Sequence, residues 1–224
     1  DPSLKAPVIT DADSFLNAVR ESGCVGLGGA AFPTWGKLNE MRNKEYTVDT
    51  VLVNAAECEP YITSDHRMMV DHPDLIVKGV DYLRTYLKEY LNNATFMICI
   101  EKNKPDAILA MKEAFASQSD VVIKELKTIY PQGAKQVMLY NATGRVSIAG
   151  KRFPYFHAII INVSSLAKMA EYLSTGMPLV ERIVTVDGSA VKEPKNLIAP
   201  IGTKISYLLE QTGLKSEPGK VIIG

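Results

Sequence analysis

A glycine-rich stretch near the N-terminus carries the residues best suited to chemistry. The segment GLGGAAFPTWGKL covers residues 26–38 and places Gly26, Gly28 and Gly29 within four positions. Glycine has no Cβ, so its backbone adopts positive φ readily and a ligand can approach its N–H group. Successive N–H groups in such a turn form a concave anion site. A helix that begins just after the turn adds its dipole, and Lys37 adds a positive charge. The stretch therefore predicts a site for the phosphate of a cofactor.

The same stretch has a second interpretation, as a tight turn between two helices with a buried ring at Phe32. It matches neither the GxGxxG motif nor the P-loop motif, which is GxxxxGK followed by serine or threonine. The standard dinucleotide fingerprint and the P-loop are therefore both excluded. A short glycine motif alone does not decide between a phosphate site and a structural turn.

A second group of polar side chains follows a predicted strand. Residues 50–55 (TVLVNA) are apolar and β-branched, which is typical of a buried strand. Asn54, Glu57, Glu59 and Tyr61 lie at or just beyond its end. Ligands of open α/β sheets collect at the carboxyl ends of the strands, so we expect function here. A solvated loop is the alternative interpretation.

Strands and helices are predicted to alternate along the first part of the chain, which indicates a Rossmann-like parallel sheet flanked by helices, with right-handed crossovers. Ser164 and Ser165 are good caps for the last of these helices. The expected strands are residues 50–55, 94–100, 121–126 and 158–163. The expected helices begin near Thr10 or Asp11, Thr34, Ser64, Pro73, Pro105, Lys135 and Ser164. The helix that begins at Pro73 is expected to reach Leu91.

The pattern changes at residue 179. Strands at 179–186 and 196–199, separated by an Asp187-Gly188 turn signal, precede a helix at 204–211 and a strand at 220–223. We expect a small β-grasp-like unit, which gives an α/β domain at 1–178 and a β-grasp domain at 179–224. Because the chain stops on a strand-like segment, we expect this second domain to be truncated.

Composition excludes several classes of protein. The 25 basic and 25 acidic residues balance, which argues against a nucleic-acid partner. No run approaches the roughly 18 apolar residues that span a bilayer. Cys24, Cys58 and Cys99 have no CxxC spacing, so we expect reduced thiols in an intracellular protein and no metal site.

Four ordered blocks resemble the RnfC family, a component of the Rnf electron-transport complex, and, more distantly, the NADH-binding flavoprotein subunit of respiratory complex I. The blocks are GLGGAAFPTWGKL at 26–38, VNAAECEPY at 53–61, YPQGAKQ at 130–136 and INVSSLAKM at 161–169. The segment PLVERIVTVDGSAV at 178–191 resembles the start of that family's soluble-ligand-binding β-grasp (SLBB) domain.

The resemblance implies noncovalently bound FMN at the carboxyl edge of the sheet. Gly26, Gly28, Gly29 and Lys37 would hold the phosphate side of the cofactor. Asn54 and Glu57 would contact the ribityl chain or the flavin ring, and Gln132 and Gly133 would form the opposite wall of the pocket. Asn162 and Ser165 would close the pocket at the last strand–helix junction. Phe32 and Glu59 would contact NADH.

The third block departs from the family pattern. Family members commonly read YPQG, one further residue and then Glu-Lys-Gln, whereas this chain reads Ala134-Lys135-Gln136 and lacks the glutamate. That carboxylate is expected beside the flavin and the nicotinamide, so its loss bears directly on NADH binding. Ala56 replaces an acidic residue of the complex I relative only, since RnfC proteins share the small residue.

The resemblance implies an oxidoreductase module that takes electrons from NADH onto FMN and passes them to iron–sulfur clusters beyond residue 224. Its partners would be the other subunits of a membrane complex, on whose cytoplasmic face it would lie. Two alternatives remain. The protein is a soluble RnfC-like carrier that serves another reductase, such as proline or corrinoid reductase, with weakened NADH binding, or it is a non-catalytic docking scaffold.

Overall fold

Four parallel strands form the centre of the fold, which a computed structural model describes for residues 3–43 and 45–223. Their order in the sheet is β3-β2-β1-β4. The strands are β1 (Val48–Ala55), β2 (Leu91–Glu101), β3 (Val121–Leu126) and β4 (Ala158–Asn162). The chain thus moves outward from β1 to β3 and then returns to the other side of β1, which confirms the predicted parallel sheet.

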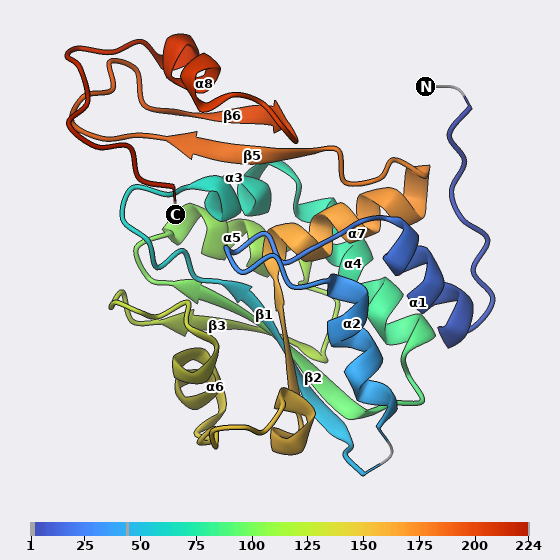
Figure 1. The fold of residues 1–224 in the computed structure, drawn as a ribbon. Helices are drawn as coiled ribbons and strands as arrows, with labels where there is room; N and C mark the ends of the chain where they lie inside the picture. Colours follow the sequence, from blue (N-terminus) through green and yellow to red (C-terminus); the bar gives the residue numbers. More distant parts are fainter. Residues whose placement is uncertain (1–2, 44, 224) are drawn as a thin grey trace.

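Helices cover both faces of this sheet (Figure 1). One face carries α1 (Ala12–Glu21), α3 (Ser64–Asp71), α4 (Pro73–Tyr86), α5 (Pro105–Ala114) and α7 (Val163–Thr175). The other face carries α6 (Lys135–Thr143), with the short 3-10 helix Phe153–Phe156 beside it. The helix α2 (Thr34–Asn39) continues into a 3-10 turn, Glu40–Arg42, and contacts β4.

Strand alternation divides the core into two layers. Val51 and Val53 of β1 point into the larger cluster beneath α1, α4 and α7, whereas Leu52 points into the smaller cluster around α6. The same alternation separates Ile159 from Ile160 in β4. Because successive side chains of a strand face opposite ways, an apolar run of this kind requires cover on both faces.

A small antiparallel unit follows the parallel sheet. Strands β5 (Glu181–Val186) and β6 (Lys195–Pro200) pair with each other, and α8 (Ile205–Thr212) comes next. This unit rests above α3 and α7 in Figure 1. Leu179 N donates to the Ser22 carbonyl at 2.8 Å, and Thr63 N donates to Thr185 Oγ1 at 3.1 Å, so polar contacts join the two units.

Several predicted boundaries are wrong. Helix α4 ends at Tyr86, because residues 87–90 turn and Leu91 already belongs to β2. The hairpin between β5 and β6 uses residues 187–194 as its loop, not a two-residue turn at Asp187-Gly188. Residues 220–223 form no strand; their side chains are exposed, and no described strand lies beside them.

One cap assignment also changes. Asn162, not Ser164 or Ser165, caps α7, since its side chain accepts the Ser165 N–H. Pro33 occupies the cap position of α2, and Thr34 is already helical. At α1, which was expected to begin near Thr10 or Asp11, Asp11 is the cap and forms a capping box with Ser14. No described helix is long and apolar enough to cross a bilayer.

Gly79 sets how closely α4 approaches α7. A Cβ at this position would lie 2.6 Å from Leu166 Cγ and 3.0 Å from the Leu166 carbonyl oxygen. We therefore expect Gly79→Ala to destabilise the protein by about 1–3 kcal/mol in thermal or urea unfolding, because overpacking exceeds the gain in helix propensity. Gly219→Ala is the control, since nothing lies within 4 Å of its added Cβ.

If the clash is the cause, Leu166→Ala should cost less in the Gly79→Ala background than in the wild type, because the two side chains compete for the same space. Additive costs would show that α4 and α7 are not held apart by this contact.

Candidate functional site

The candidate site lies where the strand order reverses, between β1 and β4. Asn54 of β1 and Asn162 of β4 are paired in register at the carboxyl ends of the two strands. A crevice opens at this point of an open α/β sheet, because the connections on either side lead in opposite directions. The fold therefore brings two of the predicted site residues to one edge.

Asn54 joins β1 to the loop that precedes α6. Its Nδ2 donates to the Gly133 carbonyl at 3.0 Å, and its Oδ1 accepts from Ala56 N at 3.1 Å. A Cβ on Gly133 would lie 2.7 Å from the Ala56 carbonyl oxygen, so only glycine permits this approach. The predicted wall at Gln132 and Gly133 thus lies against the tip of β1.

The first turn of α7 holds the glycine stretch. Leu27 N donates to Ser165 Oγ at 2.8 Å, and Ser165 Oγ donates to the Val25 carbonyl at 3.0 Å. A Cβ on Gly28 would lie 3.3 Å from Asn162 Nδ2. Residues distant in sequence therefore meet here, and the glycine stretch lies at the tip of β4.

The glycine stretch presents a row of free amides. Gly26 N donates to the Phe32 carbonyl and Ala31 N donates to the Gly26 carbonyl, which closes a loop around the residues between them. In the described part of the chain, the successive N–H groups of Gly28, Gly29 and Ala30 meet no acceptor, and these three residues are exposed. This is the donor arrangement of an anion-binding turn.

Glu57 has a structural role at the same edge. Its carboxylate accepts from Asp65 N at 2.6 Å and His66 N at 3.2 Å, so it caps the N-terminus of α3. Burial, and next the charge of Asp65, raises the pKa of Glu57 to about 7, even though Lys104 Nζ lies 3.7 Å away. In this structure its carboxylate is turned to α3, not to the glycine stretch.

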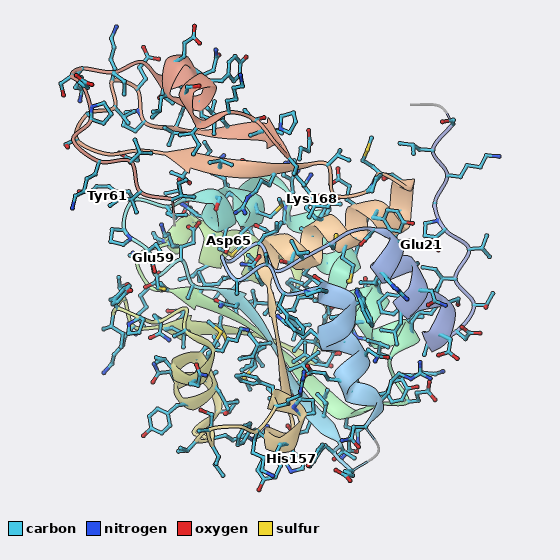
Figure 2. The ribbon with its side chains drawn as sticks, in the orientation of Figure 1. Glu21, Glu59, Tyr61, Asp65, His157 and Lys168 are labelled. Atoms are coloured by element: carbon cyan, nitrogen blue, oxygen red, sulfur yellow. The ribbon has the colours of Figure 1, made fainter. Side chains whose placement is uncertain are left out.

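Asp65 is a buried acid that sequence reasoning missed. It accepts from Asn162 Nδ2 at 2.6 Å and from the Ser164 hydroxyl. Complete burial raises the pKa of this carboxyl, and the two hydrogen bonds and the nearby Arg182 oppose that rise. Figure 2 shows Asp65 in the layer between the sheet and β5. In the sequence it resembles an ordinary first-turn acid of a helix.

A basic cleft of about 240 Å³ lies along β4, between α2 and the start of α6. Lys37, Lys135 and Lys151 line it, together with the Arg152–Glu40 ion pair. Its apolar wall comes from Phe32, Phe153, Pro154, Ile159 and Ile160. Burial, and next the charge of Lys135, lowers the pKa of Lys37 to about 8. The cleft therefore combines anion-binding charge with surface that suits an aromatic ring.

Among the described residues, the two predicted for NADH make no hydrogen bond or ring contact with each other. Phe32 lies in the basic cleft and is 40% exposed, so the alternative of a buried ring is wrong. Glu59 lies in the exposed loop after β1, beside Tyr61 in Figure 2. The hydrogen bonds and ring contacts of the described residues do not join them.

Gln132 and Arg182 each carry a buried side-chain nitrogen. The Gln132 side chain is fully buried, and its Oε1 accepts from Asn141 Nδ2 at 3.1 Å. Within the described ranges, its Nε2 and the Nε of Arg182 are the buried side-chain atoms without a partner. The described residues hold no group of three or more His, Cys, Asp or Glu side chains suited to a metal ion.

Lys135 and Arg182 were not predicted as site residues. Lys135 stands next to the missing glutamate of the third block, which was the available signal. Arg182 gave no such signal, since in the sequence it is a charged residue within a predicted strand.

Comparison with known proteins agrees with this geometry. Residues 19–171 match the family model of the Nuo51 FMN-binding domain. The chain is 39% identical to the C subunit of the proton-translocating ferredoxin:NAD+ oxidoreductase complex of Clostridium ljungdahlii, over 93% of this chain and 44% of the relative. It is also 39% identical to the C subunit of the Na+-translocating complex of Acetobacterium woodii, over 100% of this chain and 50% of the relative.

A third relative and a solved structure show the same likeness. The C subunit of an ion-translocating oxidoreductase complex from Yersinia pestis is 37% identical over 96% of this chain and 34% of the relative. A chain of an NAD+-reducing NiFe hydrogenase shares the fold, with a TM-score of 0.70 and 20% identity over 90% of this chain and 39% of that one. The chain spans half or less of the length of these relatives.

Glu57 predicts a pH dependence of stability. Its pKa rises from 4.5 to about 7 on folding, so the folded state binds the proton more tightly than the unfolded state between these values. Its contribution is therefore complete below about pH 4.5 and is lost as pH rises through about 7. Glu57→Gln should gain stability relative to the wild type between pH 5 and pH 8 in thermal unfolding of the ligand-free protein.

Glu59→Gln, in the same loop but exposed, is the control and should follow the wild type across this range. A stability difference between Glu57→Gln and the wild type that stays constant with pH would contradict the raised pKa.

Proposed function

Because this chain belongs to the family of the Nuo51 FMN-binding domain, and its curated relatives are C subunits of ion-translocating oxidoreductase complexes, we propose that it is an FMN-dependent electron-transfer module of such a complex. One observation carries the proposal. In the described part of the chain the N–H groups of Gly28, Gly29 and Ala30 have no acceptor, and Gly28 lies beside Asn162 at the switch point of the sheet. A phosphate monoester is the ligand that such a turn binds well.

The residues present fit FMN on chemical grounds. The free amides of residues 28–30 supply donors for a phosphate, and the N-terminus of α7 adds its positive dipole. Lys37 supplies a cation at the neighbouring cleft, whose apolar wall suits a planar ring. The same edge of the sheet carries the other predicted contacts, Asn54, Gln132, Gly133, Asn162 and Ser165. Glu57 stabilises this edge by capping α3.

Bound FMN would supply the redox chemistry, since a flavin accepts a hydride and releases electrons singly. The protein contributes binding and orientation. The loop amides hold the anionic end, the cleft shields the ring from water, and Lys37 and Lys135 favour negative charge nearby. We propose NADH as the donor, with Phe32 and Glu59 as its contacts, and iron–sulfur centres outside residues 1–224 as acceptors. The partners would be the remaining subunits of the complex, at the cytoplasmic face of a membrane.

A second candidate function is a soluble carrier that serves a different reductase. Lys135 favours it, because the third block places an ammonium in the cleft and lacks the carboxylate expected beside the nicotinamide. A docking scaffold without cofactor is the third candidate. The first two require flavin, and only the first requires NADH.

The visible spectrum of the purified protein with FMN tests the proposal. We expect perturbed flavin absorption and quenched fluorescence on binding, followed by anaerobic bleaching with NADH. Binding without bleaching would favour the carrier, with another donor. Failure to bind FMN or riboflavin would leave only the scaffold.

Lys37→Ala tests the assignment of this cation to the phosphate. If Lys37 reads the phosphate, the variant should lose about tenfold in FMN affinity and little in riboflavin affinity. The FMN affinity of the wild type should also fall above about pH 8, where Lys37 loses its proton, and this pH dependence should disappear in the variant. Isothermal calorimetry measures both constants.

Lys78→Ala is the control, because it removes one exposed cation on α4 outside the cleft. Equal losses for FMN and riboflavin in Lys37→Ala would place this cation at the ring. Unchanged affinity for both would exclude Lys37 from the site.

A further inference from the structure

Arg182 of β5 reaches across from the second unit into the glycine stretch. Its Nη2 donates to the Leu27 carbonyl at 3.0 Å. The amide of the same residue, Leu27, donates to Ser165 Oγ at 2.8 Å. One residue of the glycine stretch is therefore clamped from two sides, by α7 of the sheet unit and by β5 of the small unit.

This clamp has a direct geometric consequence for the next residue. The Leu27 carbonyl and the Gly28 N–H belong to one planar trans peptide and point in opposite directions. When Arg182 holds the carbonyl toward β5, the Gly28 N–H must point away from β5. Gly28 opens the row of free amides that continues through Gly29 and Ala30. The orientation of the first donor thus depends on a side chain from the second unit.

Arg182 also lies beside the buried Asp65. Both residues line a small cavity with Leu27 and Ser164. Asp65 in turn accepts from Asn162 Nδ2, and Asn162 Oδ1 accepts from Ser165 N, the residue that forms the other half of the clamp. The positive guanidinium therefore stabilises the buried carboxylate that orients the cap of α7, so Arg182 acts on both sides of Leu27.

We propose that Arg182 is a positioning residue for the phosphate-binding loop, through which the docking of the β5–β6 unit sets the affinity for the phosphorylated flavin. The inference rests on the proposed function for the identity of the ligand. The claim that Arg182 orients residues 26–31 concerns the protein alone and is the geometric part of the inference. Among the described residues, the other hydrogen bonds and ion pairs between the two units end away from this loop. Thr185 and Asn196 bind Thr63, and Glu181 lies 3.7 Å from Lys168.

Hydrogen exchange of the ligand-free protein, followed by mass spectrometry, tests the geometric part. In Arg182→Met, the peptide that covers residues 26–31 should exchange faster than in the wild type, because the loop has lost one of its two restraints. Thr185→Val is the matched control. It removes a docking contact from the same strand, and it should leave exchange in residues 26–31 unchanged.

Titration with FMN and riboflavin tests the functional part. Arg182→Met should weaken FMN binding by about tenfold, because the loop loses the charge-assisted hydrogen bond from Arg182 to the Leu27 carbonyl. Riboflavin binding should change far less, because riboflavin has no phosphate. Thr185→Val should keep the FMN-to-riboflavin affinity ratio while lowering the unfolding temperature. Arg182→Lys keeps the charge beside Asp65 without the planar guanidinium, so we expect an intermediate ratio; it also serves if Arg182→Met does not fold.

Unchanged exchange in residues 26–31 of Arg182→Met or Arg182→Lys would overturn the proposal. So would an affinity ratio that matches Thr185→Val, because the role would then be structural only. Failure of the wild type to bind either flavin would refute the proposed function, whereas faster loop exchange in Arg182→Met would still support the positioning role.

Discussion

The hydrogen bonds at the first turn of α7 are the constraint on which the site depends. Asn162 is both the last residue of β4 and the cap of α7, so the sheet and the helix together fix the position of its side chain. Ser165, one turn along, then holds Leu27 and Val25 of a segment about 140 positions earlier in the chain. A loop with exposed glycines would be costly to order by itself. Here a strand end and a helix start order it together.

Buried acids stabilise this arrangement at an electrostatic cost. Glu57 and Asp65 lie next to each other at the N-terminus of α3, and burial raises the pKa of both carboxyls. Each is compensated by a different means. Glu57 accepts backbone N–H groups of α3 and has Lys104 nearby, whereas Asp65 has Asn162, Ser164 and Arg182 around it. The hydrogen bond from Asn162 to Asp65 orients a side chain at the tip of β4, so the free-energy cost of burying this acid is linked to the geometry of the site.

The distribution of charge distinguishes the two halves of the site. At the tips of β1 and β4, donors are backbone amides and side-chain amides without formal charge. In the cleft beside α2, by contrast, three lysines and an arginine face one glutamate. Burial, and next the charge of Lys135, lowers the pKa of Lys37 to about 8, although Glu40 opposes this effect, so one carboxylate balances the cations of the cleft only in part. A phosphorylated ligand would supply that balance.

Local sequence was sufficient to predict the four parallel strands and the edge at which their carboxyl ends meet. Apolar, β-branched runs predicted the four strands, and the polar residues that follow residues 50–55 predicted a functional edge, because a parallel sheet has one carboxyl edge. Asn162 was expected at this edge only from the family resemblance, and the structure pairs it with Asn54. Glycine spacing predicted the anion-binding turn on the same local grounds. Helix ends were less well determined, since α4 ends at Tyr86 and residues 87–90 turn into β2.

Only the tertiary structure decided which side chains support that edge. Glu57 was predicted at the flavin, yet it turns to α3, because an orphan helix terminus lies within its reach. Asp65, Lys135 and Arg182 come from three separate elements and meet the glycine stretch or the cleft through contacts between residues far apart in the chain. Periodicity reports which face a residue occupies within its own element, whereas the direction in which a long charged side chain extends depends on what the neighbouring elements place there.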